Sequence, residues 1–254
     1  MFDEKDMGLM ELRLGLVSKE FRNNDIDFNM NQIINTMMAY KDNGIDFLCF
    51  GEAFLQGFDA FNWELEHDYK VALSRNSNFV NKLKSVASNY HIGLAFGYLE
   101  REAYKFYSSY MFIDKSGKEI YNYRRYSSGW KEDIADERTY LEGKEIGMFN
   151  YNNKKIIIGL CGDFWDERYD YIKKVSEIKK NVVIWPVYVD FTLQEWDDEI
   201  KDYAKQANII GDRVLMINSI CNDPKSHGGC FDFYKGTIEN KIPFDTEDVM
   251  IINV

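Results

Sequence analysis

Two side chains with complementary chemistry come directly after runs of apolar residues. Glu52 follows the run 47–51, and Cys161 follows the run 156–160. In α/β folds functional groups gather beyond the carboxyl ends of the strands, so a carboxylate and a thiol at two such ends can face one cavity. A free thiol has a pKa of about 8.5 and needs a base or a positive neighbour to attack at neutral pH. Glu52 is placed to take the thiol proton and later to return it to a leaving group.

The other cysteines and the histidines offer alternatives. A free cysteine is usually an inert buried hydrophobe, and Cys49, inside an apolar run, fits that role. Cys221 and Cys230 lie in polar, loop-like sequence without an obvious base partner. His227 raises the possibility of a Cys–His hydrolase, although three histidines without ligand spacing predict no metal site. On spacing alone, the pairing of Glu52 with Cys161 stays a hypothesis.

The elements that must position these side chains alternate along the chain. Apolar runs alternate with stretches in which apolar residues recur at helical spacing, at 30–38, 79–90, 172–178 and 196–207, and this order is typical of a layered α/β fold. Thr192 and Glu195 match a capping box, and Gly211 is placed to end the helix that they open. Residues 114–118 join two apolar runs as a hairpin turn would. The predicted strands are 12–17, 45–50, 92–98, 107–113, 119–125, 155–160, 182–189, 214–217 and 249–252, forming one mixed sheet or two.

Composition excludes several classes of function. The 254 residues carry a net charge of −11, so the chain lacks the clustered positive charge of a nucleic-acid binder. No run approaches the roughly 18 apolar residues of a membrane span, and the charged residues 1–6 do not resemble a signal peptide. The four cysteines form no C-x-x-C pair. We therefore expect a single cytoplasmic domain over residues 1–254, with no nucleic-acid or membrane partner and no metal.

The motifs around the two side chains resemble those of the nitrilase superfamily, the carbon–nitrogen hydrolases. Residues 51–58, Gly-Glu-Ala-Phe-Leu-Gln-Gly-Phe, resemble the family's catalytic-glutamate motif. Residues 158–167 resemble its nucleophile motif, in which Cys-x-Asp precedes a Phe-Pro-Glu-like segment. Residues 183–186 and 204–219 resemble the elements that follow. The resemblance covers nearly the whole chain, with the motifs in the family's order.

This resemblance implies an α/β fold, a four-layer α-β-β-α sandwich of the nitrilase type with two mixed sheets. It implies hydrolysis of a small amide, of the ω-amide or carbamoyl type, through a cysteine thioester and without a metal or organic cofactor. Glu52 would act as the base, Cys161 as the nucleophile, and the backbone N–H of Gly162 as an oxyanion donor. A homodimer is also implied, formed near residues 168–180 and 192–210.

The third catalytic member of the family is a lysine after Tyr-Arg, and here the sequence departs from the pattern. Arg125 occupies the position of the lysine, and Glu132 lies near that of a second glutamate. We expect Lys131 to supply the functional amine, because a compact ammonium can approach both a thiolate and an oxyanion, and Arg125 is the rival for this role. Glu132 would orient the cation or the substrate.

The departure leaves a second interpretation open, a nitrilase-fold protein that has lost turnover and binds a metabolite or a partner. A cation close to Cys161, such as the Lys131 amine, would favour an enzyme, whereas an amine directed to solvent would favour the binding protein. Trp165 and Trp185 flank the predicted site and are expected to shape a substrate pocket, although aromatic residues are first of all core material.

Overall fold

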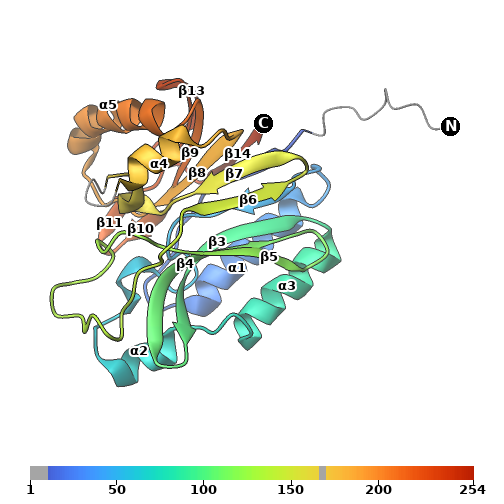
Figure 1. Cartoon of the computed structure of the whole chain (residues 1–254). Helices are drawn as coiled ribbons and strands as arrows, with labels where there is room; N and C mark the ends of the chain where they lie inside the picture. The colour runs from blue at the N-terminus through green and yellow to red at the C-terminus, as the bar shows by residue number, and fades with distance from the viewer. Residues whose placement is uncertain (1–10, 166–169) are drawn as a thin grey trace.

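Two facing six-stranded sheets make up the centre of the molecule (Figure 1). The computed structural model describes residues 11–165 and 170–254. The first sheet has the order β14 (Asp248–Asn253), β1 (Arg13–Ser18), β2 (Phe47–Cys49), β3 (Gly93–Glu102), β4 (Lys105–Ile113) and β5 (Glu119–Arg124). The second has the order β13 (Thr237–Ile242), β12 (Cys230–Tyr234), β9 (Arg213–Asn218), β8 (Val182–Val187), β7 (Lys154–Ile158) and β6 (Gly147–Tyr151). Both are mixed, with a parallel centre of β1, β2 and β3 in one and of β7, β8 and β9 in the other.

Helices cover the outer faces of the two sheets. The helices are α1 (Ile26–Tyr40), α2 (Leu65–Val71), α3 (Asn78–Tyr90), α4 (Tyr171–Glu177) and α5 (Leu193–Ile210). The helices α1 and α3 lie against the first sheet, and α4 and α5 lie against the second (Figure 1). The four-layer sandwich that the resemblance implies is therefore confirmed. Within the described residues, no helix combines the length and the apolar character needed to cross a bilayer.

Alternation along each buried strand builds the layers. In β2, Phe47 and Cys49 point into the core between the sheets, whereas Leu48 packs on the helical side. In β8, Ile184 faces the other sheet and Trp185 faces α5. This follows from the two-residue period of a strand. Burying each such large apolar side chain stabilises the fold by about 1.5–3 kcal/mol, so these strands are fixed in register as well as in position.

The capping box at the start of α5 is confirmed. The hydroxyl of Thr192 accepts a hydrogen bond from the backbone N–H of Glu195 at 3.3 Å, and the Glu195 carboxylate accepts one from the Thr192 N–H at 2.8 Å. The helix ends where the Gly211 N–H donates to the Ala207 carbonyl. Because α5 begins and ends at these residues, its apolar face is aligned with the second sheet.

Several elements lack the pattern that predicts them. The hairpin at residues 114–118 forms, but β3 continues to Glu102, four residues beyond its predicted end, because it pairs with β4 along its whole length. The strand β13 is exposed except for Ile242, so it shows no apolar alternation. Two short strands, β10 (Ile220–Asn222) and β11 (Lys225–His227), form a separate pair. Three stretches used in the sequence analysis lie outside the described residues. They are the charged residues 1–6, the end of the nucleophile-like motif at 166–167, and the start of the predicted dimer segment at 168–169.

Candidate active site

Glu52 lies in the turn that follows β2, with its side chain fully buried. The turn is held against β3 by hydrogen bonds from Phe50 N–H to the Ala95 carbonyl and from Gly97 N–H to the Gly51 carbonyl. A Cβ at position 97 would lie 2.3 Å from the backbone nitrogen of Ala53, so only glycine allows this close approach. The carboxylate is therefore placed by backbone packing at the end of a central strand.

Cys161 begins a short 3-10 turn, η3 (Cys161–Phe164), directly beyond β7. Its φ of 40° lies in the left-handed region, which for a non-glycine residue stores about 1–3 kcal/mol of strain. The Trp185 indole donates to the Cys161 carbonyl at 3.0 Å, and the thiol lies 3.8 Å from the Tyr188 carbonyl oxygen. Cys161 is partly exposed, whereas the other three cysteines are buried. Cys161 is thus the most exposed cysteine residue of the described chain, although its thiol is surrounded by protein.

A buried guanidinium joins the two halves of the site. Arg125, 2% exposed, donates from Nη1 to Oε1 of Glu52 at 2.8 Å and from Nε to the hydroxyl of Ser127 at 2.9 Å. Its Nη2 lies beside Gly162, where a Cβ would come within 2.7 Å. The hydroxyl of Ser108 also donates to Oε1 of Glu52. Within the described residues, Oε2 of Glu52 has no hydrogen-bond partner, so it is the oxygen open to a proton.

Burial dominates the electrostatics of the pair. It raises the pKa of the Cys161 thiol to about 11, against the opposing effect of Arg125. Burial also raises the pKa of the Glu52 carboxyl, and the charge of Arg125 offsets part of that rise. The resting thiol is therefore protonated at neutral pH, and its reaction requires a base that removes the proton as the sulfur attacks.

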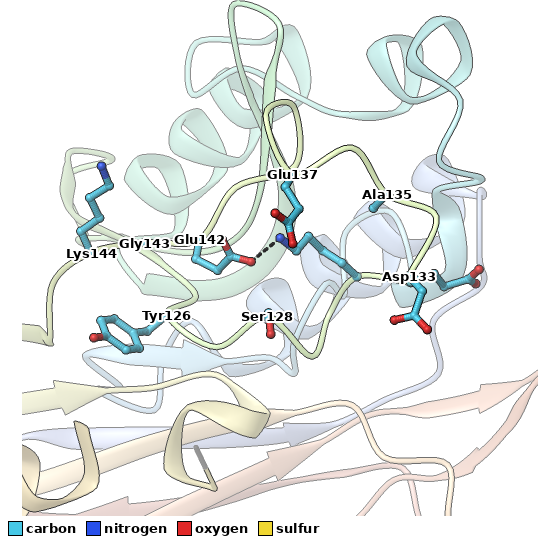
Figure 2. A pocket seen from close by; sticks show the side chains of 10 residues that line it. Tyr126, Ser128, Asp133, Ala135, Glu137, Glu142, Gly143 and Lys144 are labelled. Carbon is cyan, nitrogen blue, oxygen red and sulfur yellow. Dashed lines mark ion pairs between the residues drawn. The ribbon is translucent and has the colours of Figure 1, made fainter. Parts of the chain in front are cut away.

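Lys131 lies in the loop between β5 and β6, on the wall of a cavity of about 610 Å³. Its ammonium forms an ion pair with Glu142, marked by the dashed line in Figure 2, and donates to the Tyr140 carbonyl at 3.1 Å. In the part of the chain that the structure describes, no hydrogen bond or ion pair joins Lys131 to Cys161 or to Glu52. The amine is thus neither in solvent nor at the thiol.

The remaining predicted residues occupy different surroundings. Glu132 is exposed on the same cavity as Lys131. Trp185 is fully buried, and its indole N–H holds the turn η3 through the hydrogen bond to the Cys161 carbonyl. Trp165 is 39% exposed and packs on Trp185, with ring centroids 5.7 Å apart. His227 pairs with Asp245 at 2.8 Å.

The structure therefore brings together four of the predicted residues, Glu52, Arg125, Cys161 and Gly162. It adds the hydroxyls of Ser108 and Ser127, which bind the carboxylate and the guanidinium. Nothing in the strand pattern distinguishes these two serines from other small polar residues. Across residues 11–165 and 170–254, no group of three or more side chains is arranged to hold a metal ion.

Comparison with known sequences finds similarity over much of the chain. Residues 13–191 match the family model described as carbon–nitrogen hydrolase. The chain is similar to a glutamine-dependent NAD(+) synthetase of Thermotoga maritima, 23% identical over 159 residues, which are 62% of this chain and 27% of that protein. The chain thus spans about a quarter of the length of this curated relative.

Solved structures share the fold. An amidase of the nitrilase superfamily from Nesterenkonia superposes with a TM-score of 0.78 at 12% identity, covering 96% of this chain and 90% of that chain. The glutamine-dependent NAD+ synthetase of Acinetobacter baumannii superposes with a TM-score of 0.76 at 17% identity, covering 96% and 45%. A structure of a glutamate-to-glutamine mutant of the Nesterenkonia amidase shows covalent addition of the acetamide moiety of fluoroacetamide at the active-site cysteine.

Proposed function

The chain belongs to the carbon–nitrogen hydrolase family, and on that premise we propose that it hydrolyses the C–N bond of a small amide through a thioester on Cys161. One observation carries the proposal: the buried guanidinium of Arg125 contacts the Glu52 carboxylate at 2.8 Å and lies beside Gly162, in the nucleophile turn. A base, a thiol and a cation are the three groups that this reaction needs.

In the acylation step, Oε2 of Glu52 accepts the proton of the Cys161 thiol as the sulfur attacks the amide carbon. The raised pKa of the thiol makes this transfer necessary, since little thiolate exists at neutral pH. The carbonyl oxygen becomes an oxyanion, which Nη2 of Arg125 and the Gly162 N–H stabilise. Glu52 then returns its proton to the leaving nitrogen, the C–N bond breaks, and ammonia or an amine departs.

In the deacylation step, the same carboxylate removes a proton from a water molecule that attacks the thioester. The C–S bond breaks, the sulfur takes up the proton from Glu52, and a carboxylic acid leaves. Glu52 thus acts alternately as base and acid. Its raised pKa suits both tasks, because a carboxyl whose pKa lies nearer neutrality donates and accepts more evenly.

Arg125 takes the part of the family's lysine in this proposal, and Lys131 does not. A guanidinium presents several donors in a fixed plane, so one group can bind Glu52, Ser127 and a developing oxyanion together. Lys131 has its charge satisfied by Glu142. We assign Lys131 to holding the loop and Glu132, exposed on the same cavity, to orienting the substrate.

The proposed substrates are small amides of the ω-amide or carbamoyl type. Two kinds of relative support this class: the synthetases are named for their dependence on glutamine, an ω-amide, and an amidase has been solved in complex with acrylamide. Trp165, exposed beside the nucleophile turn, offers an apolar wall for an aliphatic chain. The proposal includes no nucleic-acid or membrane partner, a cytoplasmic location, and a homodimer through α4 and α5, where Leu193 and Ile209 expose apolar surface.

A second function is favoured by one observation, the ion pair that occupies Glu52. If Arg125 immobilises the carboxylate, the protein would bind an amide or its acid without turning it over. The family's lysine is absent from this position, so a binding protein of the same fold is the alternative.

Fluoroacetamide identifies the nucleophile, and release of ammonia from amides separates the two functions. Incubation followed by peptide mass spectrometry is expected to find an acetamide adduct on Cys161, whose sulfur displaces fluoride, and none in Cys161→Ala, whereas Cys221→Ala retains the adduct. Ammonia release is then measured with two amides, glutamine and acrylamide. Ammonia release that is lost in Cys161→Ala supports the hydrolase. No ammonia release, with or without the adduct, in protein that is folded by circular dichroism, overturns it in favour of the binding protein.

A further inference from the structure

A fully buried carboxylate lies two residues beyond the nucleophile, and the mechanism above does not use it. Asp163 accepts four hydrogen bonds. Its Oδ1 binds the backbone N–H groups of Tyr126 at 3.0 Å and Ser127 at 2.7 Å, and its Oδ2 binds the Leu160 N–H and the Tyr123 hydroxyl, both at 2.7 Å. Every lone-pair direction of this side chain is thus used by a donor.

The four donors belong to two different parts of the fold. Residues 125–127, which we call the cation loop, follow β5 of the first sheet and carry Arg125. Residues 160–163, which we call the nucleophile turn, follow β7 of the second sheet and carry Cys161. One oxygen of Asp163 binds only the cation loop, and the other binds the nucleophile turn and Tyr123. A single side chain therefore links the loop that bears the cation to the turn that bears the thiol.

The link reaches the guanidinium through Ser127. The N–H of Ser127 donates to Asp163, and its hydroxyl accepts from Nε of Arg125. The Arg125 backbone is held separately, by hydrogen bonds with the Ser108 carbonyl and the Gly143 N–H. Those contacts anchor the main chain to its own sheet but do not direct the side chain toward the other sheet. Arg125 Nη2 also lies beside Gly162, but within the described residues the hydrogen-bonded path from the guanidinium to the nucleophile turn runs through Ser127 and Asp163.

We propose that Asp163 is a positioning residue that sets the separation between the Arg125 guanidinium and the Cys161 thiol. A carboxylate is required because both of its oxygens must accept. An asparagine would turn an NH₂ group toward backbone N–H donors on one side, whichever way the amide lies. Either the cation loop or the nucleophile turn would then be released, and the cation would move away from the sulfur.

The test needs no substrate, so it stays distinct from the proposed function on which the inference rests. Iodoacetamide alkylation of each cysteine is measured by mass spectrometry between pH 7.5 and 9.5. The charge of Asp163 itself raises the pKa of the Cys161 thiol, but by less than Arg125 lowers it. In Asp163→Asn the displaced cation should therefore dominate, and we expect alkylation of Cys161 to slow by up to about tenfold, the effect of raising the thiol pKa by one unit. The rate at buried Cys221, which reports general loosening of the fold, is expected to stay unchanged.

Asp68 provides the matched control. It is also fully buried, and it also accepts from two consecutive backbone N–H groups, those of Asn62 and Trp63, and from a tyrosine hydroxyl, that of Tyr140. Asp68→Asn removes the same chemistry away from the thiol. It is expected to lower the unfolding temperature but to leave Cys161 alkylation within twofold of the original rate.

A milder pair of variants serves if Asp163→Asn fails to fold. The hydroxyl of Tyr123 contacts both Asp163 and, at 3.0 Å, the hydroxyl of Tyr171. Tyr123→Phe removes the bond to Asp163 and is expected to slow Cys161 alkylation two- to threefold. Tyr171→Phe removes the bond between the tyrosines and one with the backbone of Gly147 but leaves the bond to Asp163, so it is expected to have no effect on Cys161 alkylation.

Each outcome decides the matter. Slow alkylation confined to Asp163→Asn, or to Tyr123→Phe, supports the positioning role. The positioning role is overturned if Cys161 alkylation slows equally in Asp163→Asn and its control Asp68→Asn, or equally in Tyr123→Phe and its control Tyr171→Phe. It is also overturned if alkylation slows in none of these variants. If Cys161 of the unmodified chain reacts no faster than Cys221, the proposed nucleophile is wrong. In that case the ratio of the Cys161 alkylation rates in Asp163→Asn and in the unmodified chain still tests the positioning role.

Discussion

Replacing Arg125 with methionine tests the proposed cation most directly. The variant Arg125→Met keeps an unbranched side chain, shorter than that of arginine, and leaves Glu52, which is 0% exposed, without its ion-pair partner. Breaking a buried pair by removing one member costs about 3–5 kcal/mol, a large share of the roughly 5–15 kcal/mol that stabilises a domain. We therefore expect the midpoint of urea unfolding to fall sharply.

The stability that Arg125→Met loses should depend on pH in a definite direction. Arg125 lowers the pKa of Glu52, so its removal raises that pKa further above the value in the unfolded chain. The folded variant then holds a proton on Glu52 where the unfolded chain has released it, and its stability declines as the pH rises. The difference in free energy of unfolding between the unmodified chain and Arg125→Met is expected to be larger at pH 8 than at pH 5.

A double variant separates stability from chemistry. In Glu52→Gln/Arg125→Met both charges are gone, and removing both members of a buried pair is often neutral for stability. We expect most of the lost stability to return. The rate of ammonia release from acrylamide should stay low in both variants, because neither retains the cation that would stabilise the oxyanion. Removing one donor to an oxyanion typically lowers the rate about 10²- to 10³-fold.

Lys131→Met is the matched comparison. Its partner Glu142 is 30% exposed, and such pairs contribute about 0–1 kcal/mol. We expect little change in stability and a rate of ammonia release within a few-fold of the original. The reasoning is refuted if Lys131→Met loses the reaction while Arg125→Met retains at least a tenth of it. The catalytic amine would then be Lys131, brought to the thiol by a movement of its loop.

Two further predictions concern the same site. Gly162→Ala would place a Cβ 2.7 Å from Nη2 of Arg125, and overpacking of this kind costs about 1–3 kcal/mol. A lower temperature of thermal unfolding should show this loss, together with slower alkylation of Cys161. A variant unchanged in both would contradict the close approach. Because burial raises the pKa of Glu52, the folded chain holds that proton to higher pH than the unfolded chain. The free energy of unfolding of the unmodified chain, relative to Glu52→Gln, should therefore decline as the pH rises above 4.5, and urea titrations at several pH values would detect an opposite slope.

Much of the fold is encoded in short stretches of sequence. The run 156–160 is almost wholly apolar, and a strand buried on both faces requires that composition. Thr192 and Glu195 can form their reciprocal hydrogen bonds wherever the helix is placed, since both donors and acceptors are local. Glu52 and Cys161 could be singled out for a related reason: each is a reactive group directly after a buried strand, where a side chain becomes accessible again.

Contacts between distant segments could not be read in the same way. Arg125 and Lys131 lie six positions apart in one irregular loop, and either side chain could reach the thiol in the absence of a periodic pattern. The structure pairs Lys131 with Glu142 and Arg125 with Glu52, and the second pair spans 73 residues. Exposed strands such as β13 could not be predicted from the sequence either, because apolar and polar residues alternate only where one face of a strand is buried.

Local sequence thus decided the apolar strands, the capped helix and the two reactive groups of this chain. Tertiary structure alone decided which cation meets them and how the two sheets are joined at that point. Asp163 shows the physical reason. A buried carboxylate must have its oxygens satisfied by donors, but which donors are near depends on the packing of the sheets. Here they include the N–H groups of Tyr126 and Ser127, 37 and 36 residues away.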